Sequence, residues 1–220
     1  MCTRYVLLQE HLRAILRRLG LDEDTGYVTR YNIAPSSRLP AVRATPKREH
    51  ATLRWGLVPS WAKEDVGFKM VNARVETLAA KPAFRDALRK RRCVIPATGF
   101  YEWQTVGRTK QPWLVRRRDE QPFAFAGLWD EWLDRGTGEL HPTFTIITTE
   151  PNSLMANIHN RMPVILPTRS AEQAWLDDGL GMAAHQQLLV PYDAAAMQEY
   201  VVSKRVNSPA NNDAEVLAAA

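Results

Sequence analysis

The chain has 220 residues, of which 45% are hydrophobic, and its formal net charge is +5. This length suffices to bury a sizeable core, and no stretch approaches the roughly 18 consecutive apolar residues of a membrane helix. The first residues lack the cleavage site of a signal peptide, and two cysteines are too few for a disulfide framework. We therefore expect a cytoplasmic protein without a membrane partner.

The first half of the chain predicts two helices and at least one strand. Apolar residues recur at helical spacing over residues 9–19, and Gly20 follows as a stop signal. The next expected elements are, in order, an extended or loop segment at 31–35, a strand at 51–58 and a helix at 77–90. Pro82 limits the first turn of that second helix.

The second half of the chain predicts a sheet. Short runs rich in β-forming residues, separated by polar or Gly/Pro turns, cover residues 93–95, 99–105, 112–118, 123–128 and 143–148. This pattern indicates a largely antiparallel sheet or barrel. Helices are expected near 171–177 and 182–189, and the tail at about 211–220 is expected to be loosely held. The whole chain, 1–220, is predicted to be one α+β domain.

The basic excess lies mainly in arginine clusters. They comprise residues 89–92, residues 116–118, and the group of Arg13, Arg17 and Arg18. A guanidinium binds two phosphate oxygens at once, although each cluster alone is also typical of a solvated surface. Together they indicate a polyanionic partner without identifying it. Trp61, in a Pro-Ser-Trp-Ala loop, is the best candidate for stacking on a base or sugar.

Cys2 directly follows Met1. If Met1 is removed, residue 2 carries an amine and a thiol on adjacent carbons. Such an amine condenses with an aldehyde to a Schiff base, and the thiol then closes a thiazolidine ring. The two groups titrate at about 7.7–8.0 and about 8.5, near neutral pH. Position alone favours the simpler interpretation that Cys2 is just the residue after the start codon.

Polar residues at alternate positions suggest part of a site. In an extended chain Asn72, Arg74 and Glu76 share one face, either as the polar floor of a site or as a solvated face with a salt bridge. Glu102 lies within an aromatic run, where partial desolvation raises a carboxyl pKa and suits proton transfer. The alternative for Glu102 is an edge strand facing water.

His159 and Arg161 would also share a face in an extended segment. Histidine exchanges protons readily near pH 7, but a lone histidine is equally compatible with a hydrogen-bonded structural role. The sequence contains no zinc-type Cys/His spacing, no GxGxxG and no phosphate-binding P-loop. We therefore expect no metal, no cofactor and no nucleotide.

The order of these motifs resembles the SRAP (SOS response-associated peptidase) family of abasic-site processing proteins. The matching motifs are Met1-Cys2-x-Arg4, residues 31–35, residues 55–61, Asn72-Ala73-Arg74-x-Glu76, residues 92–103, Ile158-His159-x-Arg161-Met162-Pro163 and Val202-Ser203-x-x-Val206-Asn207. The resemblance covers almost the whole chain. One position departs from it, because Thr3 stands where the family usually has glycine.

The resemblance implies a mature protein that begins at Cys2 and crosslinks to the ring-opened aldehyde of an abasic site in single-stranded DNA. It assigns Cys2 as nucleophile, Asn72 as the residue that holds Cys2, Glu102 as a proton relay, and His159 as the acid/base that opens the sugar and resolves the crosslink. DNA contacts are implied for Arg4, Pro35, Trp61, Arg74 and Arg161. A lyase side reaction and removal of Met1, by self-cleavage or by an aminopeptidase, are further implications.

Two other functions remain alternatives at this stage. One is a thiol peptidase that uses Cys2, His159 and Glu102 on other proteins. The other is a non-catalytic single-strand binder that depends on the arginines and Trp61. We expect a monomer in each case.

Overall fold

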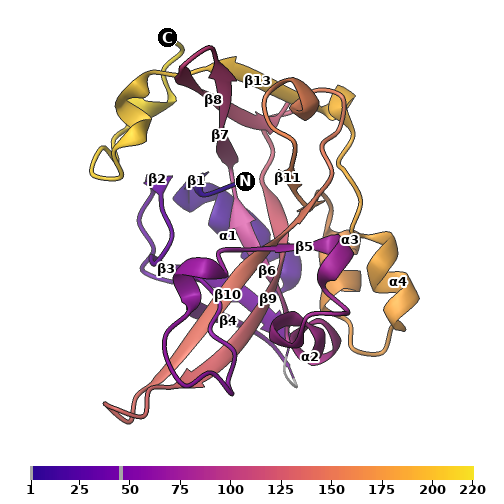
Figure 1. The fold of residues 1–220 in the computed structure, drawn as a ribbon. Coiled ribbons are helices and arrows are strands. Elements are labelled where there is room, and N and C mark those ends of the chain that lie inside the picture. Colours follow the sequence, from indigo (N-terminus) through magenta and orange to yellow (C-terminus); the bar gives the residue numbers. More distant parts are fainter. Residues whose placement is uncertain (1, 45–46) are drawn as a thin grey trace.

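The computed structural model describes residues 2–44 and 47–220, and Figure 1 shows their arrangement. The fold is α+β and its sheets are mostly antiparallel, as predicted. The four α-helices of the described residues are α1 (Gln9–Leu19), α2 (Pro82–Lys90), α3 (Arg169–Leu176) and α4 (Met182–Gln187). Among these residues, no helix combines the length and the apolar character needed to cross a membrane.

Five strands of the larger sheet close on themselves as a barrel. They are β3 (Arg38–Ala44), β4 (Arg48–Trp55), β6 (Arg92–Ala97), β9 (Phe123–Leu133) and β10 (Leu140–Thr149). Pairing runs from β10 through β4, β3, β6 and β9 back to β10, antiparallel throughout except between β10 and β4. Three short strands extend this sheet, namely β5 (Asn72–Arg74), β11 (Met162–Pro163) and β12 (Ile165–Leu166).

The second sheet is entirely antiparallel and has five strands. Their order is β13 (Met197–Val201), β8 (Thr109–Arg117), β7 (Gly99–Val106), β1 (Arg4–Leu7) and β2 (Arg30–Ile33). Only Thr98 separates β6 from β7, so the chain passes directly from the barrel into this sheet. Figure 1 shows β7, β8 and β13 at the top of the molecule and the β9–β10 hairpin at the bottom.

An aromatic cluster joins the N-terminal strand to the barrel. The ring of Tyr5 packs edge-on against Trp55 at 5.4 Å and against Phe125 at 5.6 Å between ring centroids, and all three side chains are buried. Edge-to-face aromatic pairs of this kind stabilise by about 0.5–1.5 kcal/mol beyond the area they bury. The cluster therefore fixes β1, and with it the residues that precede β1.

Helix α1 has the predicted bounds. Its apolar face is buried, and Gly20 ends it at φ 76°, where its N–H bonds to the carbonyls of Arg17 and Leu16. This is the left-handed cap that glycine adopts without strain.

In the first half of the chain, two predicted elements begin or end elsewhere. The strand expected at 51–58 is β4, which ends at Trp55 because Gly56 turns the chain at φ 122°. The helix expected from residue 77 begins at Pro82, after a separate 3-10 turn at Val75–Thr77. Proline lacks an N–H and has a helix-compatible φ, so it suits the first position of a helix.

The C-terminal segment, expected to be loosely held, makes specific contacts. The side-chain oxygen of Asn212 accepts hydrogen bonds from the backbone N–H groups of Tyr31 and Asn32, at 2.8 and 3.0 Å. Val216 is fully buried in a small cluster with residues of β1, β7 and β8. These contacts fasten the tail to the second sheet, a non-local interaction that composition alone does not signal.

Candidate active site

Cys2 is fully buried at the entrance to β1. Strand β1 pairs with β7 so that Arg4 lies opposite Tyr101, which brings residue 2 alongside the part of β7 that carries Glu102. Burial raises the pKa of the Cys2 thiol well above its usual value, and the negative charge of Glu102 raises it further. The thiol is therefore a neutral S–H near pH 7, and it donates weakly to the Arg4 carbonyl at 3.8 Å.

Asn72 holds the backbone of Cys2. Strand β5 lies parallel to β10, with Asn72 opposite Ile146, and its side-chain Nδ2 donates to the Cys2 carbonyl oxygen at 2.8 Å. This contact joins residues that are 70 positions apart in the chain. Asn72 therefore holds the backbone of Cys2 in place through the Cys2 carbonyl.

Glu102 is buried rather than facing water, because β7 is an interior strand between β1 and β8. Burial raises the pKa of Glu102 to about 7, against the lowering effects of the Trp103 backbone N–H and of the Lys110 charge. A carboxyl that titrates near neutral pH both accepts and donates protons under working conditions. Of the two sequence interpretations, proton transfer fits this environment.

His159 is half-buried and lies in irregular backbone directly after a turn, outside the named strands. The short 3-10 turn Met155–Asn157 precedes it, and the Arg161 backbone N–H donates to its Nδ1 at 3.1 Å. That bond makes Nδ1 an acceptor, so the neutral ring carries its proton on Nε2. Burial lowers the pKa of His159, and the positive charge of Lys110 lowers it further. The imidazole is thus held mainly neutral at pH 7.

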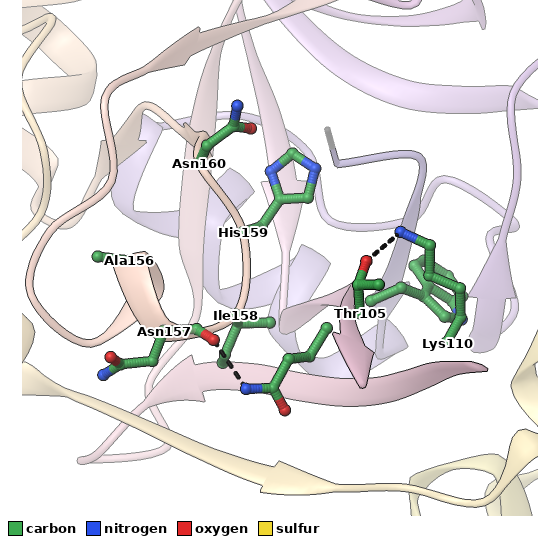
Figure 2. A pocket seen from close by; sticks show the side chains of 9 residues that line it. Thr105, Lys110, Ala156, Asn157, Ile158, His159 and Asn160 are labelled. Carbon is green, nitrogen blue, oxygen red and sulfur yellow. Dashed lines mark hydrogen bonds between the residues drawn. The ribbon is translucent and has the colours of Figure 1, made fainter. Parts of the chain in front are cut away.

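A cavity of about 370 Å³ opens beside His159. Figure 2 shows it between the β7–β8 hairpin, which contributes Thr105 and Lys110, and the segment that contributes His159 and Asn160. A hydrogen bond from the Gln104 side chain to the Asn157 carbonyl, at 2.8 Å, ties the two walls together. Lys110, which lies opposite Thr105 in this hairpin, was not among the predicted site residues.

The predicted common face of Asn72, Arg74 and Glu76 does not form. The strand ends at Arg74, and Glu76 lies in the following 3-10 turn. There both oxygens of Glu76 accept from the Arg161 guanidinium, at 2.6 and 3.1 Å, which lowers the pKa of Glu76. Arg161 also donates to the Thr148 carbonyl at 2.6 Å. The salt bridge expected within one strand is therefore a contact between two segments.

The other arginines expected at DNA differ in their exposure. Arg4 is half-buried and donates to Asn32 Oδ1 at 3.0 Å and to the Val206 and Asn207 carbonyls at 2.9 and 3.2 Å. Arg74 is exposed at the end of β5. Arg4 thus fastens the C-terminal segment to β1, whereas Arg74 presents its charge to solvent.

Aromatic exposure is concentrated in the loop between β4 and β5. Trp61 is 60% exposed, and Phe68, which the sequence analysis missed, is 72% exposed in the same loop. Pro35 is half-buried next to Ser36, which turns the chain at φ 69°. Large exposed aromatic side chains suit stacking on unpaired bases. An aromatic residue in an otherwise polar segment was the signal for Phe68.

The described residues contain no group of three or more His, Cys, Asp and Glu side chains that could hold a metal ion. Both cysteines are free and buried, Cys2 at this site and Cys93 in the barrel wall. The site therefore combines a cysteine next to the start of the chain with an amide anchor, a neutral-range carboxyl and a neutral imidazole. These groups suit nucleophilic chemistry with proton transfer.

The comparisons with known proteins identify the family. A family model described as SOS response associated peptidase (SRAP) matches residues 1–209. The chain belongs to the SRAP family. It is 44% identical over 226 residues to the abasic site processing protein YoqW of Bacillus subtilis, with 99% of each chain covered. It is 31% identical to the abasic site processing protein HMCES of Xenopus tropicalis, over 88% of this chain and 67% of that protein.

Solved structures share the fold. A protein from Bacteroides thetaiotaomicron superimposes with a TM-score of 0.90 at 32% identity, and all of both chains is covered. A protein from Bordetella bronchiseptica gives a TM-score of 0.77 at 28% identity, over 92% of this chain and all of the other.

Proposed function

We propose that this protein captures abasic sites in single-stranded DNA through the amine and the thiol of Cys2, after removal of Met1, and so shields the lesion. The names of its relatives support the substrate. The single observation that carries the proposal is the hydrogen bond from Asn72 to the Cys2 carbonyl, because a reacting terminal residue must be held. On this proposal the protein acts as a monomer, as one SRAP domain over residues 1–220, in the cytoplasm at the nucleoid.

The first step joins the Cys2 amine to the aldehyde carbon of the ring-opened sugar. Glu102 carries the two amine protons in turn to the carbonyl oxygen, which becomes a hydroxyl and then leaves as water, and the product is a neutral Schiff base. A carboxyl whose pKa lies at about 7 suits both transfers, since neither protonation state is strongly favoured at neutral pH.

The second step closes the ring. The Cys2 sulfur bonds to the Schiff-base carbon, the C=N electron pair moves to nitrogen, and the thiol proton follows it. The product is a thiazolidine. A raised thiol pKa is compatible with this step, because the proton is carried to nitrogen within the same residue. Holding both groups on one residue makes closure intramolecular.

His159 acts on the sugar in this scheme. An abasic deoxyribose is mostly a closed ring, so a base must take the proton of its 1-hydroxyl while the ring oxygen is protonated. A neutral imidazole takes the hydroxyl proton, and the imidazolium so formed gives a proton to the ring oxygen. The same transfers in reverse resolve the crosslink.

The surrounding residues orient the strand. Arg4, Arg74 and Arg161 contribute positive charge for phosphates, and Pro35 and Trp61 wedge against the flanking bases. Arg4 and Arg161 already bond to protein acceptors, so they either share those bonds with DNA or act mainly by charge. Arg74 has the most accessible guanidinium of the three.

Two side activities follow from the same chemistry. A Schiff base activates the neighbouring sugar carbon, so β-elimination of the 3′ phosphate gives a lyase reaction. Met1 is removed either by the protein itself or by an aminopeptidase.

A thiol peptidase that acts on other proteins is less well supported. Peptidase cysteines attack as thiolates, which a lowered pKa favours. At Cys2, burial and the nearby Glu102 raise the thiol pKa instead. Blocking the α-amine separates the two functions, because a peptidase keeps its activity and a crosslinking protein loses it.

A denaturing gel tests the proposal. Purified protein mixed with an abasic single-stranded oligonucleotide should give a heat-stable shifted band, and a tetrahydrofuran analogue without the aldehyde should give none. Salt-sensitive binding that denaturant abolishes, with no stable band on any abasic strand, would identify a non-catalytic binder instead.

A further inference from the structure

The β7–β8 hairpin carries a cation to the cavity of Figure 2. Lys110 lies directly opposite Thr105 across the two strands, and its ammonium donates to Thr105 Oγ1 at 2.7 Å. The acceptor is a neutral hydroxyl, so this bond orients the ammonium without cancelling its charge. A lysine head on a four-carbon stem moves easily to a stronger acceptor.

The charge of Lys110 reaches both acid/base groups of the site. It lowers the pKa of Glu102 and the pKa of His159. Lys110 and His159 line the same cavity, so an anion bound to Lys110 lies beside the residue proposed to act on the sugar.

The cavity also offers neutral polar partners. His159 and Asn160 line the wall opposite Lys110, and the volume of about 370 Å³ exceeds what a phosphate group needs. The His159 imidazole, whose Nδ1 accepts from the Arg161 N–H, forms part of the same wall. Cation, imidazole and amide are the donor types that bind phosphate oxygens in proteins.

Two of the three arginines near the site have strong protein partners, and the third, Arg74, is exposed to solvent. Arg161 is paired with both oxygens of Glu76, and Arg4 is bonded to an amide oxygen and two carbonyls. We propose that Lys110, with His159 and Asn160, forms a subsite for one backbone phosphate next to the abasic sugar. This assignment, which rests on the proposed function, makes Lys110 a residue that selects an aldehyde within a DNA strand over a free aldehyde.

Two substrates test the assignment. Capture rates are measured for an abasic oligonucleotide and for free 2-deoxyribose, which has the aldehyde but no phosphate. Lys110→Met should lower the ratio of the two rates about tenfold or more, as expected for loss of a charge-assisted hydrogen bond. Lys110→Arg should restore most of the ratio. Lys81→Met, which removes an equal charge from the exposed start of α2, is the matched control and should leave the ratio unchanged.

A neutral methylphosphonate placed at each linkage beside the abasic site then locates the contact. At one linkage, the methylphosphonate should lower the capture rate of the wild type to that of Lys110→Met. The same methylphosphonate should not lower the capture rate of Lys110→Met further, because the two changes remove the same contact. Three outcomes would each overturn this assignment but not the proposed function. The first is that the losses in capture rate add at every linkage, and the second is that Lys110→Met loses rate equally on both substrates. The third is that Lys110→Met behaves like Lys81→Met. Failure of the wild type to capture any abasic strand would overturn the proposed function and this assignment with it.

Discussion

Asn72 and Cys2 are joined by a hydrogen bond of 2.8 Å from the Asn72 side chain to the Cys2 carbonyl. The bond links the short parallel strand β5 to the residue that precedes β1, so the barrel positions the start of the second sheet. In the proposed chemistry it holds the reacting residue while both its amine and its thiol form bonds.

Replacing Asn72 with alanine should slow crosslinking while leaving the fold intact. The change leaves the Cys2 carbonyl without this partner, and loss of such a bond costs about 1–3 kcal/mol, or roughly 5- to 150-fold in rate if it is felt in the transition state. Single-turnover crosslinking followed on denaturing gels measures the effect, and thermal unfolding reports the fold. An unchanged rate in a folded Asn72→Ala protein would refute the anchoring role.

Glu102→Gln should change the pH dependence of both rate and stability. The crosslinking rate of the wild type should inflect near pH 7, where Glu102 titrates, and this inflection should disappear in the glutamine variant. A pH series of single-turnover rates provides the comparison.

The stability effect has a definite sign. The folded pKa of Glu102, about 7, lies above the unfolded value of about 4.3, so the folded state holds the extra proton between these values. The free energy of unfolding therefore falls as pH rises through that window. Glutamine does not titrate, so the unfolding free energy of Glu102→Gln does not fall in this way. The melting temperature of the variant should therefore exceed that of the wild type by an amount that grows as pH rises to about 7. A constant difference across the window would contradict a buried, titrating Glu102.

His159→Ala should slow release of the crosslink more than it weakens binding of DNA. The imidazole supplies the proton transfers of ring opening and resolution, which typically contribute about 10²–10⁴-fold. Release is followed by chasing the crosslinked protein with excess abasic strand, and binding by anisotropy with a tetrahydrofuran oligonucleotide. Equal losses in the two assays would argue against an acid/base role.

Trp61→Ala and Phe68→Ala should each weaken binding of single-stranded DNA by about 1–3 kcal/mol, the range for one lost base–aromatic stack. The assay is equilibrium anisotropy with the tetrahydrofuran strand, so that no covalent step contributes. Val28→Ala, at a residue 69% exposed outside this loop, is the control and should bind normally. If Phe68→Ala also binds normally, Trp61 is the residue of this loop that stacks on DNA and Phe68 is not.

Local patterns predicted local structure well. The bounds of α1 and its Gly20 cap follow from apolar spacing and from the need for a left-handed residue. The alternation of β7 also separated the face of Glu102 from that of Tyr101 and Trp103. Whether Glu102 faces water depends on strands that pair with β7 from elsewhere in the chain, and a local pattern does not carry that information.

The errors occurred where an extended chain was assumed. Glu76 lies in a 3-10 turn, so it does not share a strand face with Asn72 and Arg74, although it forms an ion pair with Arg161 across segments. The contact of Asn72 with Cys2 spans 70 positions and was anticipated only through family resemblance. Lys110 was missed because its partner across the hairpin is a plain threonine.

The central claim is that the reactive unit is the whole of Cys2, amine and thiol together, after loss of Met1. The direct measurement treats the crosslinked protein with a thiol-alkylating reagent, digests it with trypsin, and determines the mass of the N-terminal peptide. We predict a peptide of residues 2–4 that carries the sugar fragment and resists alkylation, because both nitrogen and sulfur are bonded to it. A crosslinked peptide that retains Met1, or one whose Cys2 thiol is still alkylated, would contradict the account.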